Sequence, residues 1–172
     1  MATVKQVLKS KSDTAVHTIS AEANVYEAIA LMSHAGVGAL VVTAGGDQNG
    51  AVGGIVTERD YARKVILQDK ASRTTTVGEI MSAPVMSVSL ATRTDDCMAL
   101  MTRHRIRHLP VIDGVRLVGM VSIGDMIRYV IDEQQFAIDQ LETYVRGPHH
   151  DAPTCALTRR SPLPQTLATR LA

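Results

Sequence analysis

The sequence predicts an α+β fold of two β-α-β-β-α repeats, with an extended helix at the end of the second repeat. The main observation is internal repetition, because Gly54–Asp60 (GIVTERD) returns as Gly119–Asp125 (GMVSIGD) 65 residues later. A second apolar segment, Val37–Val42, returns as Ile106–Val111 after 69 residues. The difference between these spacings places a four-residue insertion before Gly54, in a Gly- and Asn-rich segment that is expected to form a loop.

Each repeat is expected to begin with a short helix, a brief strand and a longer helix. The short helices are expected over 4–8 and 77–81, and the strands around 15–19 and 85–89. Asn24 and Thr94 are the predicted N-caps of the longer helices, because their side chains are suited to accept from free backbone N–H groups. Glu27, three residues after Asn24, completes a capping-box pattern.

Two strands and a second helix complete each repeat. The strands are expected over 39–43 and 54–56, and over 108–112 and 117–121. Pro110 predicts an edge or irregular strand, because proline cannot donate to a sheet. The last helices begin at Thr57 and Ser122, and the second is much longer, reaching about Val145. One repeat alone would bury too little apolar surface, so the two are expected to pack together.

These elements divide the chain into four segments. Repeat 1 covers 3–70, repeat 2 covers 71–131, the extension of the last helix covers 132–146, and 147–172 form a proline-rich tail expected to be disordered. Apolar residues mark the long helix at roughly heptad spacing: Ile127, Ile131, Ile138, Leu141 and Val145. We expect this stripe to bury itself against a second copy, which predicts a homodimer.

The composition narrows the functional classes. Lys and Arg number 18 and Asp and Glu 17, so a net charge of +1 does not favour a nucleic-acid or membrane partner. No apolar run approaches the ~20 residues that span a bilayer, and no apolar signal stretch opens the chain, so a cytoplasmic protein is expected. Cys97 and Cys155 lack metal-ligand or redox-pair spacing, and Cys97 is expected in the core. His149 and His150 are expected to be solvated, and no metal site is predicted.

The pairs Thr57/Asp60 and Ser122/Asp125 are the candidate functional motifs. A hydroxyl and a carboxylate three residues apart at a helix start predict a capping box. The same groups suit a nucleotide, since the helix start can hold phosphate and the carboxylate can accept from both ribose hydroxyls. Gly54 is expected to let a ligand approach the backbone closely. Capping alone does not require the preceding glycine and apolar residues to recur, so the duplication favours a ligand site.

The repeats resemble the CBS domain family, named after cystathionine β-synthase, over about residues 3–131. The resemblance rests on Gly38–Val42 (GALVV) and Arg107–Val111 (RHLPV), each followed by G-x-x-(T/S)-x-x-D. It implies a stand-alone CBS-domain pair, related by a pseudo-twofold axis, with two clefts between its sheets. Such pairs commonly bind adenosine derivatives and serve regulation. The implied ligand is an adenine nucleotide (AMP, ADP or ATP), with NAD and S-adenosylmethionine as further candidates.

The resemblance also implies which residues surround each ligand. Those of the first cleft are Thr57, Asp60, Ile55, Met86, Ile106 and Arg107. Those of the second are His17, Val37, Gly38, Met120, Ser122 and Asp125. Arg107 and His108 are implied to lie near the phosphates, while Arg103 and Arg105 are expected to be surface charges. Arg59 and Arg107 correspond to Gly124 and Gly38, so the first cleft is expected to prefer the ligand with more phosphate charge.

The resulting hypothesis is a regulatory module, not an enzyme, that binds adenine nucleotides and signals to an unidentified effector protein. Two alternatives remain open. The first alternative is a structural homodimerisation module with vestigial clefts, and the second is an enzyme. The intact Asp60 and Asp125 favour binding over vestigial clefts. The enzyme alternative is the weakest, because no general base, nucleophile or metal cage is evident.

Overall fold

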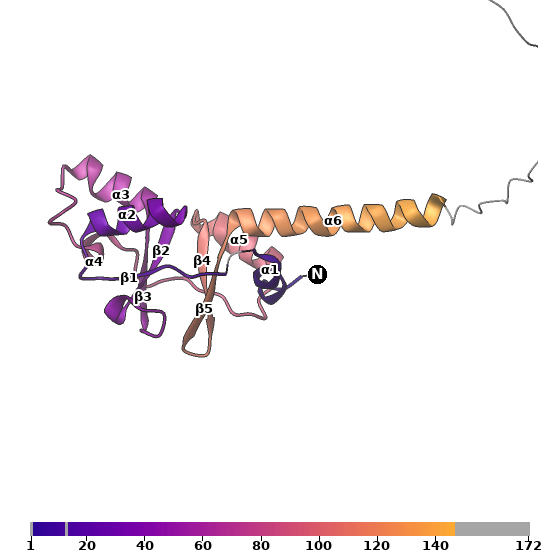
Figure 1. The fold of residues 1–172 in the computed structure, drawn as a ribbon, viewed down its shortest axis with the longest axis horizontal. Coiled ribbons are helices and arrows are strands. Elements are labelled where there is room, and N and C mark those ends of the chain that lie inside the picture. Colours follow the sequence, from indigo (N-terminus) through magenta and orange to yellow (C-terminus); the bar gives the residue numbers. More distant parts are fainter. Residues whose placement is uncertain (1, 13, 147–172) are drawn as a thin grey trace, which may run out of the picture. The chain divides into compact units, whose positions relative to one another are not determined.

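The computed structural model describes residues 2–12 and 14–146, and the chain divides into two units, Met1–Gln134 and Gln135–Ala172. Figure 1 labels the elements. The helices are α1 (Val4–Ser10), α2 (Val25–Ala35), α3 (Glu58–Lys64), α4 (Val77–Ile80), α5 (Thr94–His104) and α6 (Ile123–Arg146). The strands are β1 (Thr18–Ser20), β2 (Ala39–Thr43), β3 (Val52–Thr57), β4 (His108–Asp113) and β5 (Arg116–Ser122). The tail over 147–172, with His149, His150 and Cys155, lies outside the described residues.

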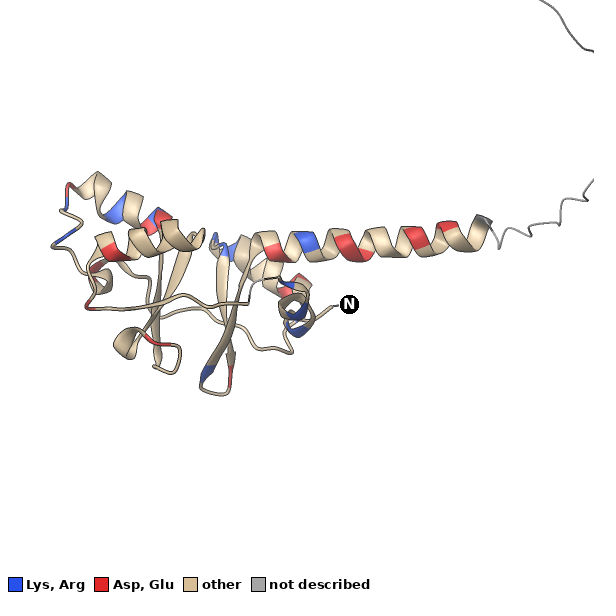
Figure 2. Ribbon diagram, in the orientation of Figure 1, with Lys and Arg blue, Asp and Glu red and all other residues tan. Residues whose placement is uncertain are grey.

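The first sheet has the order β1-β2-β3, with β1 parallel and β3 antiparallel to β2. All five residues of β2 are buried, and β2 and β3 carry no charged side chain (Figure 2). A central strand covered on both faces is expected to be uniformly apolar, so its sequence and position agree. The strand expected around 15–19 forms only over Thr18–Ser20.

The second sheet pairs β4 with β5 antiparallel, Leu109 opposite Val121. The strand expected over 85–89 is wrong, because only Val88 forms a bridge, to Val111. In the first repeat Val41 donates to the His17 carbonyl, and the residue that matches Val41 is Pro110. Proline has no N–H, so the pairing cannot extend to Met86. The register shifts between Val111 and Ile112, but the same shift occurs between Val42 and Thr43 in the first repeat, so Pro110 is not its cause. The prediction of an edge strand is confirmed, since β4 belongs to a two-stranded sheet.

The two longer helices of the repeats start differently. Asn24 caps α2 as predicted, since its side chain accepts from the Glu27 N–H at 2.9 Å. The prediction that Thr94 caps α5 is wrong, because Arg93 occupies the N-cap and Thr94 is the first helical residue. Thr94 is buried, and its hydroxyl and backbone N–H donate to the Ala2 carbonyl at 3.4 and 3.1 Å. The N-terminal segment of the chain therefore uses a group that sequence alone assigned to local capping.

The short opening helices are exchanged between the repeats. Val4 and Val7 of α1 belong to a buried cluster whose other members lie between residues 88 and 126. Val77 and Ile80 of α4 belong to the cluster of residues 19–65. Figure 1 shows α1 beside β5, in the other repeat. The core of each half therefore needs residues from both sides of the boundary expected at 70/71, and the repeats are interlocked.

The last helix follows the sequence prediction closely. It begins after Ser122 and runs to Arg146, the last described residue. Within the second unit, Ile138 is 48% and Leu141 64% exposed. Such side chains on one helix are candidates for a partner surface. A search of the described residues finds no helix with the length and hydrophobicity needed to cross a membrane.

Candidate ligand-binding clefts

Both Thr/Ser-x-x-Asp motifs adopt the same hydrogen-bonded geometry at a helix start. The Thr57 N–H and hydroxyl donate to Asp60 Oδ2 at 3.1 and 2.6 Å, and the Asp60 N–H donates to Thr57 Oγ1 at 3.2 Å. In the second motif the Ser122 N–H and hydroxyl donate to Asp125 Oδ2 at 2.7 and 2.8 Å. Each motif thus forms a capping box, which fixes the orientation of its carboxylate.

The first cleft lies between the two halves and has a volume of about 300 Å³. The residues that line it are Gly38, Ile55, Thr57, Glu58, Arg59, Asp60, Arg63, Ser82, Arg105, Ile106, Arg107 and His108. They include the predicted Ile55, Ile106 and Arg107 beside the Thr57/Asp60 pair. Within the described part of the chain, no carboxylate forms an ion pair with any of its four arginines. The cleft therefore offers four arginines against two carboxylates, which favours an anionic ligand.

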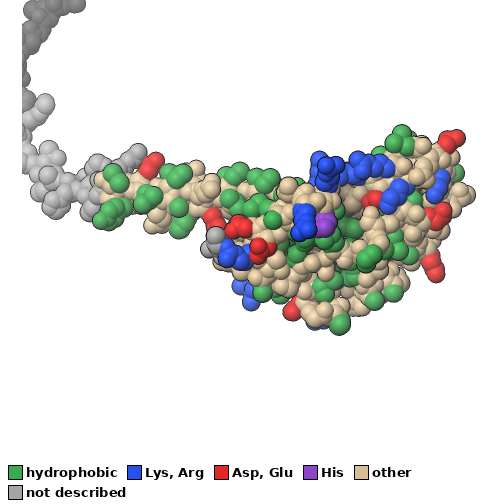
Figure 3. All heavy atoms as spheres, turned by 180° about the vertical axis from the view of Figure 1, so that it is seen from behind, with side chains coloured by type: hydrophobic (Ala, Val, Ile, Leu, Met, Phe, Trp, Pro, Cys, Tyr) green, Lys and Arg blue, Asp and Glu red, His purple; other side chains and the backbone are tan. Residues whose placement is uncertain are grey.

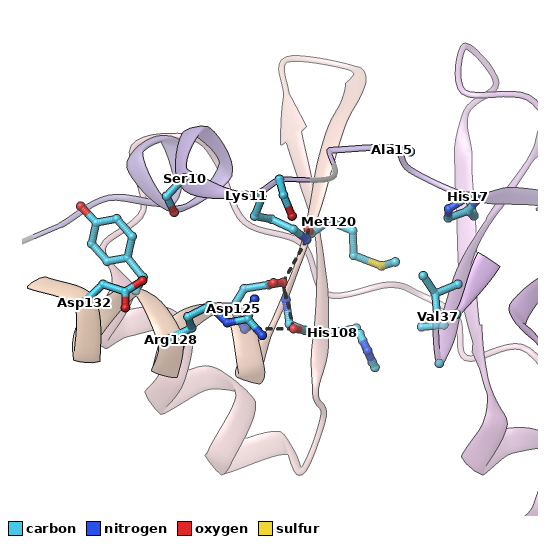
Figure 4. Close-up of a pocket in the computed structure, with 16 residues that line it drawn as sticks. Ser10, Lys11, Ala15, His17, Val37, His108, Met120, Asp125, Arg128 and Asp132 are labelled. Carbon is cyan, nitrogen blue, oxygen red and sulfur yellow. Dashed lines mark hydrogen bonds and ion pairs between the residues drawn. The ribbon is translucent and has the colours of Figure 1, made fainter. Parts of the chain in front are cut away.

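The second cleft is larger, about 580 Å³. The residues that line it are Ser10, Lys11, Ser12, Ala15, His17, Gly36, Val37, Gly38, Ala39, His108, Met120, Ser122, Asp125, Arg128, Tyr129 and Asp132. All six residues predicted for this cleft are among them. Figure 4 shows His17 and Val37 at one end of the cleft, with Arg128 and Asp132 at the other. Both volumes are within the range of small-molecule sites, about 300–1,000 Å³.

Met86 is the predicted residue that the structure does not bring to the first cleft. It packs instead beside the core cluster of the second half. Its counterpart His17 lines the second cleft, and the backbone carbonyl of His17 accepts a hydrogen bond from the Val41 N–H. Pro110, in the place of Val41, has no N–H to hold Met86 in the same way.

His108 and Gly38 line both clefts. A Cβ added at Gly38 would lie 3.9 Å from His108 Cε1 and 3.3 Å from Glu58 Oε2, so the two residues form one wall. Burial lowers the pKa of the His108 imidazole, as do the charges of Arg107 and Lys11, while Asp125 and Glu58 act in the opposite direction. A neutral imidazole is therefore favoured at the wall that the clefts share.

Several lining residues were missed by the sequence prediction. Lys11 lies in a segment without a repeated motif, and it donates to Asp125 Oδ2 at 3.0 Å. Arg63 and Arg128 occupy the two clefts and are 65 residues apart, so the repeat spacing would have identified them. Arg105 is exposed, as expected for a surface charge, but it also lines the first cleft, and its carbonyl accepts from Arg59 Nη1 at 3.0 Å. Figure 3 shows several Lys and Arg side chains close together along the upper edge of the face in view.

The role predicted for Gly54 is wrong. A Cβ at this position would lie 2.7 Å from Met81 Sδ and 3.1 Å from the Ser82 carbonyl oxygen. The glycine is thus required by the close approach of the segment that follows α4, and the protein itself fills the space that we assigned to a ligand.

The remaining candidates agree with a structural role. Cys97 is fully buried, and its burial, aided by the charge of Asp96, raises the pKa of the thiol to about 11. The core position predicted for Cys97 is confirmed, and a thiolate nucleophile is not favoured there. Among the described residues, no group of three His, Cys, Asp or Glu side chains is arranged to hold a metal ion.

Comparison with known proteins supports the repeat assignment. The family model for the CBS domain matches residues 4–66 and 77–132. A mitochondrial CBS domain-containing protein of Arabidopsis thaliana, CBSX3, is 41% identical over 150 residues, which cover 84% of this chain and 72% of the relative. YhcV, a CBS domain-containing protein of Bacillus subtilis, is 34% identical over 119 residues, 69% of this chain and 81% of YhcV.

Solved structures show the same fold. A Burkholderia ambifaria protein with CBS domains, provisionally assigned to signal transduction, is 52% identical with a TM-score of 0.72. The match covers 77% of this chain and 96% of that protein. A hexameric CBS-CP12 protein from bloom-forming cyanobacteria is 30% identical with a TM-score of 0.64, over 74% of this chain and 70% of that one.

Proposed function

Since the chain belongs to the CBS domain family, we propose that it is a regulatory module that binds adenine nucleotides in its two clefts and communicates their occupancy to a partner protein. The observation that carries this proposal is the pair of oriented carboxylates, Asp60 and Asp125, each at the edge of a cavity of suitable size. Helix capping alone would not require a cavity with cations beside each carboxylate.

The chemistry of the walls is consistent with a nucleotide. Ile55 and Ile106 in the first cleft, and Val37 and Met120 in the second, offer apolar surface to a planar base. The carboxylates are suited to accept hydrogen bonds from ribose hydroxyls, and the cations are suited to phosphate. Adenine as the base follows from the resemblance to the CBS domain family.

The two clefts are proposed to prefer different ligands. The first presents four arginines against Glu58 and Asp60, whereas the second presents Lys11 and Arg128 against Asp125 and Asp132. The excess of positive charge in the first cleft favours the ligand with more phosphate charge, such as ATP. The balanced second cleft favours a ligand with less charge, such as AMP.

A panel of nucleotides tests the proposal by thermal unfolding. Binding to the native state raises its stability by mass action, by about 2.7 kcal/mol when the free ligand is at 100 times its Kd. We expect AMP, ADP or ATP to raise the Tm and the guanine nucleotides at equal concentration to leave it unchanged. Equal shifts from guanine and adenine nucleotides would show that the base is not selected. The absence of any shift would refute the proposal.

A homodimer is the second proposal, and the exposed apolar side chains of α6 support it. Ile138, Leu141 and Val145 lie three and four residues apart, so they share one face of the helix. A second copy would supply an identical face, and closed twofold dimers are the commonest assembly. Dimerisation is compatible with nucleotide binding and would provide one route for communicating it.

A further inference from the structure

The two motif carboxylates have lysine partners in different places. Asp60 Oδ1 pairs with Lys64 Nζ at 2.9 Å, within α3 and four residues on, and Lys64 is not among the described residues that line the first cleft. Asp125 Oδ2 pairs with Lys11 Nζ at 3.0 Å, and Lys11 lies inside the second cleft. Lys11 is supplied by the chain that follows α1, 114 positions before Asp125.

Lys11 occupies the middle of the second cleft. Its ammonium also donates to the Met120 carbonyl at 3.2 Å, so it bridges the wall proposed for the base and the carboxylate proposed for the ribose (Figure 4). The Lys11 and Asp125 side chains are only 25% and 23% exposed. In this partly desolvated position, an ammonium that loses its partners without gaining others is costly.

Lys11 has no lysine counterpart in the first cleft, where the segment after α4 supplies Ser82, whose hydroxyl donates to Asp60 Oδ1 at 3.4 Å. The opening helices match with an offset of 73 residues, from Leu8 to Met81, and this offset takes Lys11 to Pro84. Likewise, the residue that matches Lys64 in the second repeat is Tyr129. The ion pair inside the second cleft is thus specific to this cleft and does not follow from the duplication.

We propose that Lys11 makes the second cleft selective for a nucleoside monophosphate over the free nucleoside, an inference that rests on the proposed nucleotide-binding function. A nucleoside without phosphate competes with Lys11 for Asp125 and Met120 and gives the ammonium nothing in return. A 5′-phosphate is a stronger partner for Lys11 than a carboxylate whose Oδ2 already accepts two hydrogen bonds from Ser122.

The neighbours of Lys11 restrict the length of the phosphate chain. Arg128 is three residues beyond Asp125 on α6, on the same side of the helix, and adds a second cation. Asp132 lies one further turn along, where its carboxylate would repel additional phosphates. Lys11 and Arg128 together can balance the two charges of one phosphate group, and Asp132 disfavours a longer phosphate chain.

Calorimetry on the full chain tests this role. Asp60→Ala is used as the background so that the second cleft dominates binding. In this background we expect AMP to bind about tenfold or more tightly than adenosine, the scale of one charge-assisted hydrogen bond. Lys11→Met should weaken AMP and strengthen adenosine, so that the ratio of the two affinities falls towards one. Lys11→Arg, which keeps the charge, should retain the preference.

Lys9→Met is the matched control, since it makes the same change at an exposed position of α1 and should leave the ratio unaltered. Cooperative thermal unfolding of each variant verifies that it is folded. A ratio that Lys11→Met does not change would overturn the role of Lys11 while leaving nucleotide binding intact. If neither AMP nor adenosine binds even to the unsubstituted chain, the proposed function fails and the role of Lys11 fails with it.

Discussion

Leu8 of α1 occupies the space that a side chain on Gly119 of β5 would need. A Cβ built on Gly119 would lie 2.8 Å from Leu8 Cδ1, closer than real contacts allow. The matched glycine, Gly54, meets Met81, the residue that corresponds to Leu8 in the other repeat. The conserved geometry of this pair shows that the repeated glycine serves the exchange of opening helices between the halves.

Substitution of these glycines is expected to destabilise the fold. Gly119→Ala and Gly54→Ala should each lower the free energy of unfolding by roughly 1–3 kcal/mol through overpacking. Gly54→Ala should cost more, because one of its close contacts is the backbone carbonyl of Ser82, which moves less easily than a leucine side chain. Urea denaturation measures both. Gly53→Ala, with its nearest contact at 3.8 Å, is the control, and an equal loss there would contradict the packing argument.

Loss of either motif carboxylate is expected to weaken one site. Asp60→Ala and Asp125→Ala should each cost about 1.5–3 kcal/mol in binding at the cleft concerned, the range for a hydrogen bond to a charged group. Each also removes a capping box, so calorimetry must be done well below the lowered Tm. Asp113→Ala, at the end of β4 and outside both clefts, should bind like the unsubstituted chain. Unchanged affinity in the double variant would reject the assignment of both carboxylates.

Arg59 is expected to distinguish ATP from AMP. Arg59→Gly, which installs the residue found at the matched position of the second motif, should weaken ATP binding at the first cleft by about tenfold and AMP binding less. The reciprocal Gly124→Arg should raise the affinity of the second cleft for ATP, and a Cβ at this position would make only an ordinary contact, 3.6 Å from Ser122 Oγ. Two identical sites that ignore both substitutions would show that the charge difference has no effect.

His108 is expected to make stability depend on pH. Burial lowers the pKa of His108 in the folded state, so the unfolded chain takes up the proton first, near pH 6.5. Above that pH, His108 does not reduce the free energy of unfolding. As the pH falls from the unfolded pKa to the lower folded pKa, protonation of the unfolded chain reduces the free energy of unfolding. Stability curves for the unsubstituted chain and His108→Gln should therefore diverge between about pH 7 and 5. Parallel curves would mean that His108 does not contribute.

The exposed face of α6 is expected to hold a dimer together. Leu141→Glu should shift the protein towards monomer, because a buried charge in the interface is costly. Gln140→Glu adds the same charge at the neighbouring exposed position and should leave the dimer intact. Light scattering at micromolar concentration reads out both, and a monomeric unsubstituted chain would reject the proposal.

The sequence by itself determined the repeat, the order of most elements and both motifs. These features are local or periodic: a capping box needs only Thr57 and Asp60 three residues apart, and β2 needs only an unbroken apolar run. The repeated motif also identified Ser122 and Asp125 of the second cleft, because duplicated segments fold alike. The other four residues predicted for this cleft came from the resemblance to the CBS domain family.

Tertiary structure alone decided the features that depend on which distant segments meet. The exchange of α1 and α4, the glycine contacts of Leu8 and Met81, and the place of Lys11 between Met120 and Asp125 all join residues far apart in the chain. Local pattern carries no information on such pairs, since an exposed lysine and a cleft lysine look alike in sequence. The absence of Met86 from the first cleft depends on both sequence and tertiary structure. We attribute it to Pro110, which has no N–H, and the proline is visible in the sequence. Its effect on Met86 can be recognised only once the strand pairing is known.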